Sequence, residues 1–451
     1  MGGSRGSLSA AVWLVAGALI ASLAVPSAAG AFGISSFSVT PSTTQAGGHP
    51  DTAVSLSFSG PGTVRDLTLD LPPGMIGNPE TKNKCSQTAF QADRCPSSSS
   101  VGTVNVIAAA LGVLSIPVPG TVYVLQPEPS DAATLGIVVR ATGDLPIVGK
   151  IFSVAHFSAV RNSDGDYFLR SSIKGLPNSA RAALGLVPVP MTIKQMTLNL
   201  KAAGNAPGTF FLTNPTGCQP ATSATEATSH DNETATAQSS FTPTNCSAVP
   251  FNPAFHLETS TTQAGARLSL STTITLPGNE NPIRQSHVKS VALKFPPGMS
   301  LDILGALGVT PCSDENFAAD TCPALSDIGD VQVAVPPLPP DFTGDVYRVA
   351  PPPGQTYGFG VVLRGPRGLK ATVRGGGALT SVPTPEGIYV WQVVSTFPML
   401  PEIPFTTFKL AITRPIFFNG STCVTRNAEA TLNGWSGASA TLTEPYTTTG
   451  C

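Results

Sequence analysis

The spacing of the cysteines constrains the fold of this chain more than any other feature. Eight cysteines occur in 451 residues, and separations of 10 and 28 residues appear in the first four and again in the last four. A pattern that repeats in this way favours pairing between close cysteines. The four predicted disulfides are Cys85–Cys95, Cys218–Cys246, Cys312–Cys322 and Cys423–Cys451. Such bridges imply an oxidising compartment. Metal binding is the alternative, but short CxxC pairs are absent and no histidine lies at ligand spacing from a cysteine.

The segments around the cysteines show that the chain is a tandem duplication. Short motifs of the first half, TTQAG, PPGM and CxxxxFxxxxCP, recur in the same order in the second half. The matched segments are Thr43–Gly47 with Thr261–Gly265, Pro72–Met75 with Pro296–Met299, and Cys85–Pro96 with Cys312–Pro323. We therefore predict two repeats, residues 32–249 and 250–451, which we call repeat 1 and repeat 2.

The first 31 residues have the three parts of a secretory signal peptide. Arg5 precedes an apolar run over residues 8–25, and small residues follow, so cleavage is expected after Ala29 or Ala31. A retained membrane anchor is the alternative, because the apolar run is marginally long enough to span a bilayer. The signal predicts a secreted or cell-surface protein with no transmembrane segment in the mature chain.

Each repeat reads as a series of short antiparallel strands. Runs such as VRDLTLDL, TLGIVVRA and TIKQMTLNL are β-branched and often alternating, and Gly, Pro, Asn or Asp clusters separate them. We predict an all-β fold of two tandem disulfide-stapled β-sandwiches. One helical turn is expected between the closely spaced cysteines, with Ser86 or Ser313 as its N-cap and Phe90 or Phe317 pointing inward.

Composition excludes some partners and offers little chemistry. The net charge is −2 and charged residues are only 12% of the chain, so neither nucleic acid nor an anionic membrane is expected as a partner. No catalytic residue and no cofactor is predicted. Asp164 and Asp166, on either side of Gly165, are the one calcium candidate, and a hairpin turn is the alternative.

Four apolar stretches punctuated by proline could carry function. They are LGVLSIPVPG (111–120), LGLVPVPM (184–191), VPPLPPDF (335–342) and FPMLPEIPF (397–405). If several project together they would form an exposed apolar patch, which usually marks a partner surface. The interpretation we favour is that they cross the open ends of each sandwich and fill its core.

As a set, LPPGM, CxxxxFxxxxCP, GxVY and FLTNPTGC resemble a group of exported, repeat-containing β proteins of high-GC bacteria that have no assigned activity. The resemblance implies a surface or extracellular β-repeat protein and supplies no catalytic residues. The leading functional hypothesis is a non-enzymatic structural, adhesive or assembly unit, whose partners would be cell-envelope components, a glycan or another protein. The alternatives are a binding module for a glycan or an apolar ligand, and a secreted hydrolase with dispersed carboxylates.

Non-reducing peptide mass spectrometry on the exported protein tests these predictions together. We expect a mature N-terminus after Ala29 or Ala31 and four crosslinks, each within one repeat. Free thiols or a crosslink between the repeats would contradict the assignment of two independently oxidised repeats.

Overall fold

A computed structural model describes residues 31–110, 114–141, 147–163, 165–182, 188–278, 282–302 and 308–451. The predicted signal peptide therefore lies outside the described residues, apart from Ala31. Phe32 is buried, and the first strand begins at the next residue. The folded part of repeat 1 thus begins directly after the predicted cleavage sites.

The described residues form a nearly all-β molecule, as predicted. The elements of repeat 1 are β1 (Gly33–Pro41), β2 (Thr52–Ser59), β3 (Val64–Asp70), β4 (Ile76–Gly77), α1 (Gln87–Gln91), β5 (Ser100–Ala110), β6 (Leu114–Val124), β7 (Ala133–Ala141), β8 (Ile147–Arg161), β9 (Tyr167–Ile173), β10 (Ser179–Ala182), β11 (Pro188–Leu200), β12 (Leu212–Thr213), β13 (Ala221–Ser229) and β14 (Thr234–Phe241). Those of repeat 2 are β15 (Ala254–Thr259), β16 (Arg267–Thr275), β17 (Val288–Lys294), β18 (Ser300–Leu301), α3 (Asp314–Ala319), β19 (Asp327–Ala334), β20 (Phe342–Val349), β21 (Tyr357–Arg364), β22 (Lys370–Pro383), β23 (Tyr389–Phe397), β24 (Thr407–Phe418), β25 (Thr425–Gly434) and β26 (Ser439–Thr447). Short 3-10 turns are η1 (Pro79–Thr81), η2 (Ser97–Ser99), η3 (Cys246–Ala248), η4 (Ala324–Ser326) and η5 (Pro366–Gly368).

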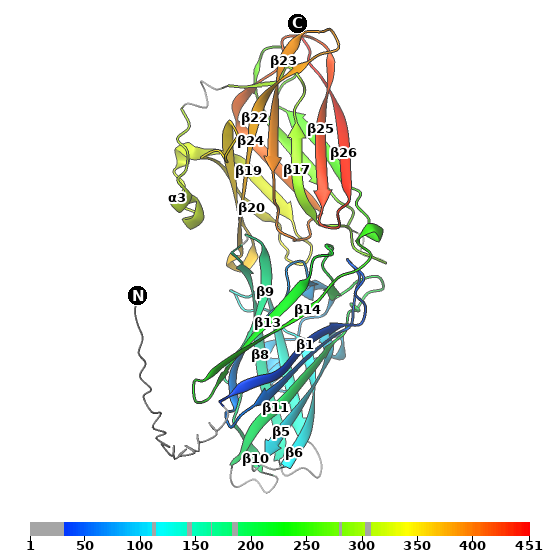
Figure 1. The fold of residues 1–451 in the computed structure, drawn as a ribbon, viewed down its shortest axis with the longest axis vertical. Helices are drawn as coiled ribbons and strands as arrows, with labels where there is room; N and C mark the ends of the chain where they lie inside the picture. The colour runs from blue at the N-terminus through cyan, green and yellow to red at the C-terminus, as the bar shows by residue number, and fades with distance from the viewer. Residues whose placement is uncertain are drawn as a thin grey trace, which may run out of the picture.

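The two repeats share one topology. Repeat 1 is a sheet in the order β1-β2-β11-β5-β6-β7-β8-β9-β3-β13-β14, and repeat 2 follows the equivalent order β15-β16-β24-β19-β20-β21-β22-β23-β17-β25-β26. Each sheet folds over one apolar core, so that its two halves face each other as a sandwich. The repeats stack end to end along the long axis of the molecule (Figure 1).

The two outer strands of each sheet meet and close it. In repeat 1 the side chains of β14 and of the turn before it reach β1 and the residue that precedes it. The Val39 N–H donates to Ser239 Oγ at 3.0 Å, and the Phe32 N–H donates to Glu233 Oε2 at 3.0 Å. In repeat 2 the Leu257 N–H donates to Glu444 Oε2 at 2.7 Å. These bonds satisfy donors that an open sheet edge would leave exposed.

The helical turns lie where the sequence predicts them. The Ser86 hydroxyl accepts a hydrogen bond from the Ala89 N–H, as an N-cap does, and Phe90 is 1% exposed. Phe90 packs on Gly136 of β7, where a Cβ atom would come within 2.6 Å of the ring. The equivalent residues of repeat 2 are Ser313, Phe317 and Gly360. Both repeats therefore keep a glycine at this position because a side chain there would clash with the phenylalanine ring.

Each disulfide joins two cysteines of the same repeat, and each repeat contains two of them. The structure pairs Cys85 with Cys95, Cys218 with Cys246, Cys312 with Cys322 and Cys423 with Cys451. The described helices are α1 and α3, and neither has the length or the apolar composition needed to cross a bilayer.

Candidate functional site

The two repeats meet at a junction centred on the buried carboxyl group of Glu402. This residue comes from the loop between β23 and β24, and its side chain is 7% exposed. Its Oε1 accepts hydrogen bonds from repeat 1: from the Thr216 N–H at 2.7 Å, the Thr216 hydroxyl at 2.9 Å and the Gly217 N–H at 3.0 Å. Because these donors converge on one oxygen, the position of repeat 2 on repeat 1 is strongly specified.

Burial raises the pKa of Glu402 to about 7. The hydrogen bonds from Thr216 and Gly217 lower this pKa, and the nearby Asp166 carboxylate raises it further, but burial has the largest effect. The Nδ1 atom of His287 lies 3.9 Å from Oε1 of Glu402. Burial, with a smaller contribution from Arg284, holds the pKa of His287 well below its usual range. The imidazole is therefore neutral, and Glu402 is the junction group that titrates near neutral pH.

Gly74, in the first PPGM motif, lies directly against this acid. Its φ is +79°, and a Cβ atom there would be 2.4 Å from Cδ of Glu402. The equivalent Gly298 of repeat 2 has φ +95°, but a Cβ atom there would meet only Gly420, at 3.6 Å. The motif makes the same turn twice, and only its first copy makes room for the junction acid.

Further hydrogen bonds cross the junction. Arg161 Nη1 donates to Thr372 Oγ1 at 3.0 Å, and the Thr372 N–H donates to the Tyr167 hydroxyl at 3.1 Å. The Arg284 N–H donates to the carbonyl oxygen of Gly47, in the first TTQAG motif, at 2.9 Å. The repeats are thus joined through several segments that lie far apart in the sequence.

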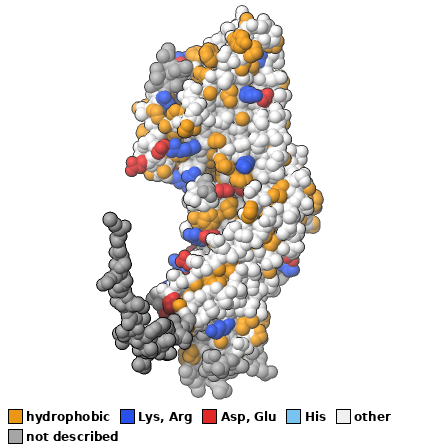
Figure 2. Space-filling model, in the orientation of Figure 1, with side chains coloured by type: hydrophobic (Ala, Val, Ile, Leu, Met, Phe, Trp, Pro, Cys, Tyr) orange, Lys and Arg blue, Asp and Glu red, His pale blue; other side chains and the backbone are white. Residues whose placement is uncertain are grey.

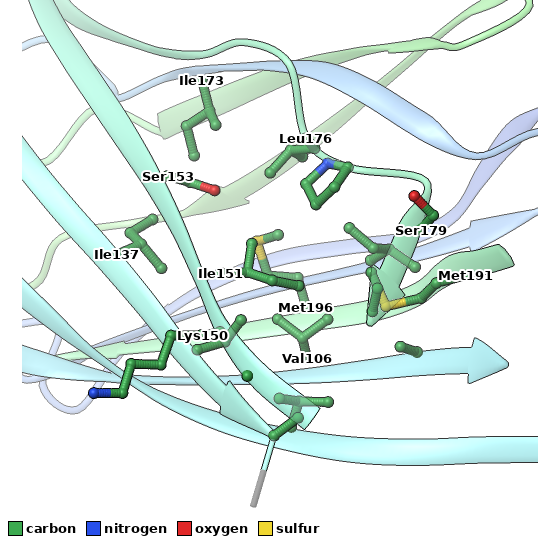
Figure 3. Close-up of a pocket in the computed structure, with 18 residues that line it drawn as sticks. Val106, Ile137, Lys150, Ile151, Ser153, Ile173, Leu176, Ser179, Met191 and Met196 are labelled. Carbon is green, nitrogen blue, oxygen red and sulfur yellow. The ribbon is translucent and has the colours of Figure 1, made fainter. Parts of the chain in front are cut away.

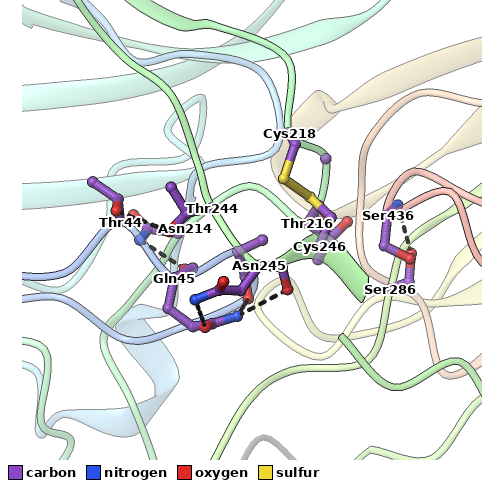
Figure 4. Close-up of a disulfide and its surroundings, with 12 residues drawn as sticks. Thr44, Gln45, Asn214, Thr216, Cys218, Thr244, Asn245, Cys246, Ser286 and Ser436 are labelled. Carbon is purple, nitrogen blue, oxygen red and sulfur yellow. Dashed lines mark hydrogen bonds between the residues drawn. A yellow bond between two sulfur atoms is a disulfide. The ribbon is translucent and has the colours of Figure 1, made fainter. Parts of the chain in front are cut away.

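A disulfide supports the repeat 1 side of this junction. Figure 4 shows the Cys218–Cys246 bridge beside Thr216, the residue that holds Glu402. Asn214, two residues before Thr216, is fully buried, and its side-chain amide donates a hydrogen bond to the carbonyl oxygen of Gln45 at 3.0 Å. The bridge and the asparagine therefore fix the loop that presents the two backbone donors.

The calcium candidate falls at this same junction. Asp164 lies outside the described residues. Asp166 ends the hairpin turn between β8 and β9, and its Oδ1 accepts hydrogen bonds from the Tyr167 N–H at 2.8 Å and the Glu402 N–H at 3.0 Å. In the structure this carboxylate therefore orders the turn and its contact with repeat 2.

Asp166 and Glu402 border a cleft of about 470 Å³ between the repeats. Figure 2 shows the molecule hollowed between the repeats on one side, where several of its few charged side chains gather. A two-carboxylate hydrolase would need converging acids of this kind. Here, however, both carboxyl groups accept hydrogen bonds from backbone N–H groups of the junction. Both groups therefore help to hold the two repeats together.

A second cavity lies at the opposite, free end of repeat 1. It has a volume of about 420 Å³ and lies inside the sandwich (Figure 3). Its wall is mostly apolar, with Met191, Met196 and Ile151 among the labelled side chains, and Lys150 stands at its edge. The size and lining fit a site for a small apolar ligand.

A closed ring of strands forms the wall of this cavity. Strand β10 pairs with both β11 and β8, and these are already connected through β5, β6 and β7. The six strands of the ring are β5, β6, β7, β8, β10 and β11. Residues from every one of them line the cavity, together with Ile173 of β9 and Leu176.

The proline-rich stretches contribute to the cores with part of their residues. Val118, Met191, Phe342 and Leu400, one from each stretch, are all buried. Residues 111–113 and 184–187 lie outside the described part. Several of the prolines in these stretches are exposed, and so is Met399, with 54% exposure.

A cluster that the sequence analysis missed lies near the junction. His156 Nδ1 is 2.7 Å from Oδ2 of Asp131 and 3.9 Å from Oε2 of Glu128. Two carboxylates and an imidazole are a set that binds divalent transition metals. The Thr134 hydroxyl also donates to Asp131, at 2.7 Å. No local sequence signal marks this cluster, because its members lie on β8 and on the loop before β7.

Comparison with known proteins yields no assignment. No family model and no curated protein matches the chain. Among solved structures, the C-terminal domain of the AgI/II polypeptide BspA of Streptococcus agalactiae shares 10% identity at a TM-score of 0.18, over 92% of this chain and 100% of that one. A type II cohesin dyad from the adaptor ScaA scaffoldin of Acetivibrio cellulolyticus shares 8% identity at 0.15, over 90% and 94%. Likenesses of this size carry no argument about function.

The raised pKa of Glu402 predicts a pH-dependent junction. Since the folded-state pKa is about 7 and the ordinary value 4.5, the stabilisation is complete below pH 4.5 and is lost as the pH rises through 7. The loss is at most about 3 kcal/mol. Calorimetric unfolding across this pH range should show the decline in the wild type and in a control, Glu315→Gln, at an exposed site. Glu402→Gln should remove it, and an unchanged slope in that variant would refute the assignment.

The two PPGM glycines allow a matched comparison. Gly74→Ala and Gly298→Ala introduce the same positive-φ strain, of order 1 kcal/mol each. Only Gly74→Ala also forces a methyl group onto Glu402. Thermal unfolding should therefore show a lower midpoint for Gly74→Ala than for Gly298→Ala, together with a less compact particle in small-angle scattering. Equal effects of the two variants would mean that Gly74 serves the turn alone.

Proposed function

We propose that this chain is a non-enzymatic structural and adhesive protein of the extracellular space or cell surface, in which two repeats act as one stiff unit. The observation that carries the proposal is the junction, where the buried Glu402 is held by the backbone of repeat 1. The four disulfides support an oxidising compartment. Membership of the exported high-GC group, which rests on the sequence resemblance, stays a prediction.

The free end of repeat 2 supplies the contact surface in this proposal. Ile388, Tyr389 and Trp391 are 51%, 73% and 58% exposed, and they lie on the β22–β23 hairpin at the tip of the molecule (Figure 1). Contiguous exposed aromatic side chains are typical of protein interaction sites.

The internal junction indicates what kind of partner this hairpin takes. Trp391 occupies in repeat 2 the position that Tyr167 occupies in repeat 1. The equivalent strand pairs are Trp391 with Ser381 and Tyr167 with Arg161. Tyr167 contacts the facing end of repeat 2, and its hydroxyl accepts a hydrogen bond from there. The hairpin with Trp391 therefore suits the equivalent end of another repeat, which a second copy of this chain presents at the free end of its repeat 1. Such heterologous contacts build open, head-to-tail assemblies.

Sedimentation velocity over a concentration series tests this proposal. The wild type should associate as concentration rises, and Tyr389→Ser with Trp391→Ser should abolish association, because the apolar contact area is lost. Leu325→Ser, which removes a 59% exposed leucine elsewhere, is the matched control and should associate like the wild type. A wild type that stays monomeric throughout, or a control that also fails to associate, would overturn the proposed contact.

A further inference from the structure

The two repeats fill the same interior space differently. Strand registers place Val118, Met196 and Ile173 of repeat 1 at the positions of Phe342, Phe408 and Phe397 in repeat 2. The three phenylalanines of repeat 2 are all buried in its core. The corresponding space in repeat 2, which Ala159 and Tyr167 of repeat 1 also border, has a volume of about 100 Å³, against about 420 Å³ in repeat 1. One fold thus accommodates both a filled and an open interior.

The strands around the open interior also differ. Pro117 and Pro119 lie in the part of β6 that pairs with β5 but not with β7, because pairing with β7 begins at Gly120. Proline lacks the N–H that pairing with a second neighbouring strand would need. In repeat 2, β20 pairs with both neighbours from Thr343 onward, next to its first residue, Phe342. Among the described residues, pairing between β6 and β7 therefore stops at Gly120, beside the cavity of repeat 1.

The rim of the cavity carries excess positive charge. Lys150 Nζ lies 2.7 Å from Oδ2 of Asp93, and Arg140 also binds this carboxylate, with Nε at 3.0 Å. Two cations thus share one carboxylate. In repeat 2 the equivalent arginine, Arg364, binds a second carboxylate, Asp345, at 2.6 Å, which balances the charge there. Lys150 is half exposed and lies at the cavity edge, and in Figure 3 its ammonium group points away from the apolar interior.

We propose that the end cavity of repeat 1 binds a single-chain anionic amphiphile, such as a long-chain fatty acid. The alkyl chain occupies the apolar interior, and the acidic head group lies at the rim beside Lys150. Burial of each methylene group favours binding, and the charge pair at the rim sets orientation. This inference does not depend on the head-to-tail contact proposed above, since it concerns the interior of one repeat.

The repeat 2 side chains supply variants that fill the cavity. Val118→Phe and Met196→Phe each place in repeat 1 the residue that repeat 2 carries at the same register. Met399→Phe makes the same change at an exposed position and is the matched control. Each variant is checked for intact disulfides and cooperative thermal unfolding, and two cavity-filling variants are made in case one fails to fold.

The experiment is titration of the mature protein with a fluorescent long-chain fatty acid, at a concentration where sedimentation shows monomers. The wild type and Met399→Phe should give the same saturable signal. Folded Val118→Phe or Met196→Phe should bind at least about tenfold more weakly, because the chain has lost its space. No saturable binding by the wild type, or equal binding by a folded cavity-filling variant, would overturn the proposal whatever the outcome of the self-association test.

The head group is tested separately by displacement of the probe. An unlabelled fatty acid should displace it more effectively than the alcohol of the same chain length, and Lys150→Gln should remove this preference. If both compounds displace the probe equally from the wild type, the cavity binds alkyl chains without regard to charge, and the role of Lys150 is wrong.

Discussion

A sheet of this size depends on how its outer strands are covered, because each would otherwise expose a row of unpaired backbone groups. Both repeats solve this by curling until the first and last strands meet, and by using Glu233, Ser239 and Glu444 to accept hydrogen bonds from the opposite edge. Closure along the sides leaves each repeat with only two free ends. The junction, the cavity and the aromatic hairpin all lie at such ends, which is where a closed sandwich can still make specific contacts.

Local features of the sequence predicted local structure well. The N-caps at Ser86 and Ser313 and the buried Phe90 and Phe317 depend on residues within a few positions, and the structure contains them. The same holds for the alternating strands and for cysteine pairs that are neighbours in sequence. Glu402 was missed because its partners lie 185 and 186 residues away, and nothing in the surrounding FPMLPEIPF stretch marks an acid held by another repeat. The cavity was missed for a related reason, since it depends on what faces Val118 across the core.

Duplication allowed the repeats to diverge inside a constant frame. Glycines that make room for the phenylalanine of the helical turn, Gly136 and Gly360, are retained in both copies because the backbone packing requires them. Interior side chains such as Val118 and Phe342 differ because volume can be redistributed within a core without a change of topology. Gly74 and Gly298 are a third case. Both form the same turn, but only Gly74 contacts Glu402 at the junction.

The order of the disulfides along the chain bears on how the protein reaches its native state. Every bridge joins a cysteine to the next cysteine in sequence, with separations of 10 and 28 residues. A chain that enters an oxidising compartment N-terminus first therefore presents each native pair before the following pair emerges. Pairing by order of arrival and pairing in the final fold then coincide, so oxidative maturation of this protein does not require the reshuffling of mispaired thiols.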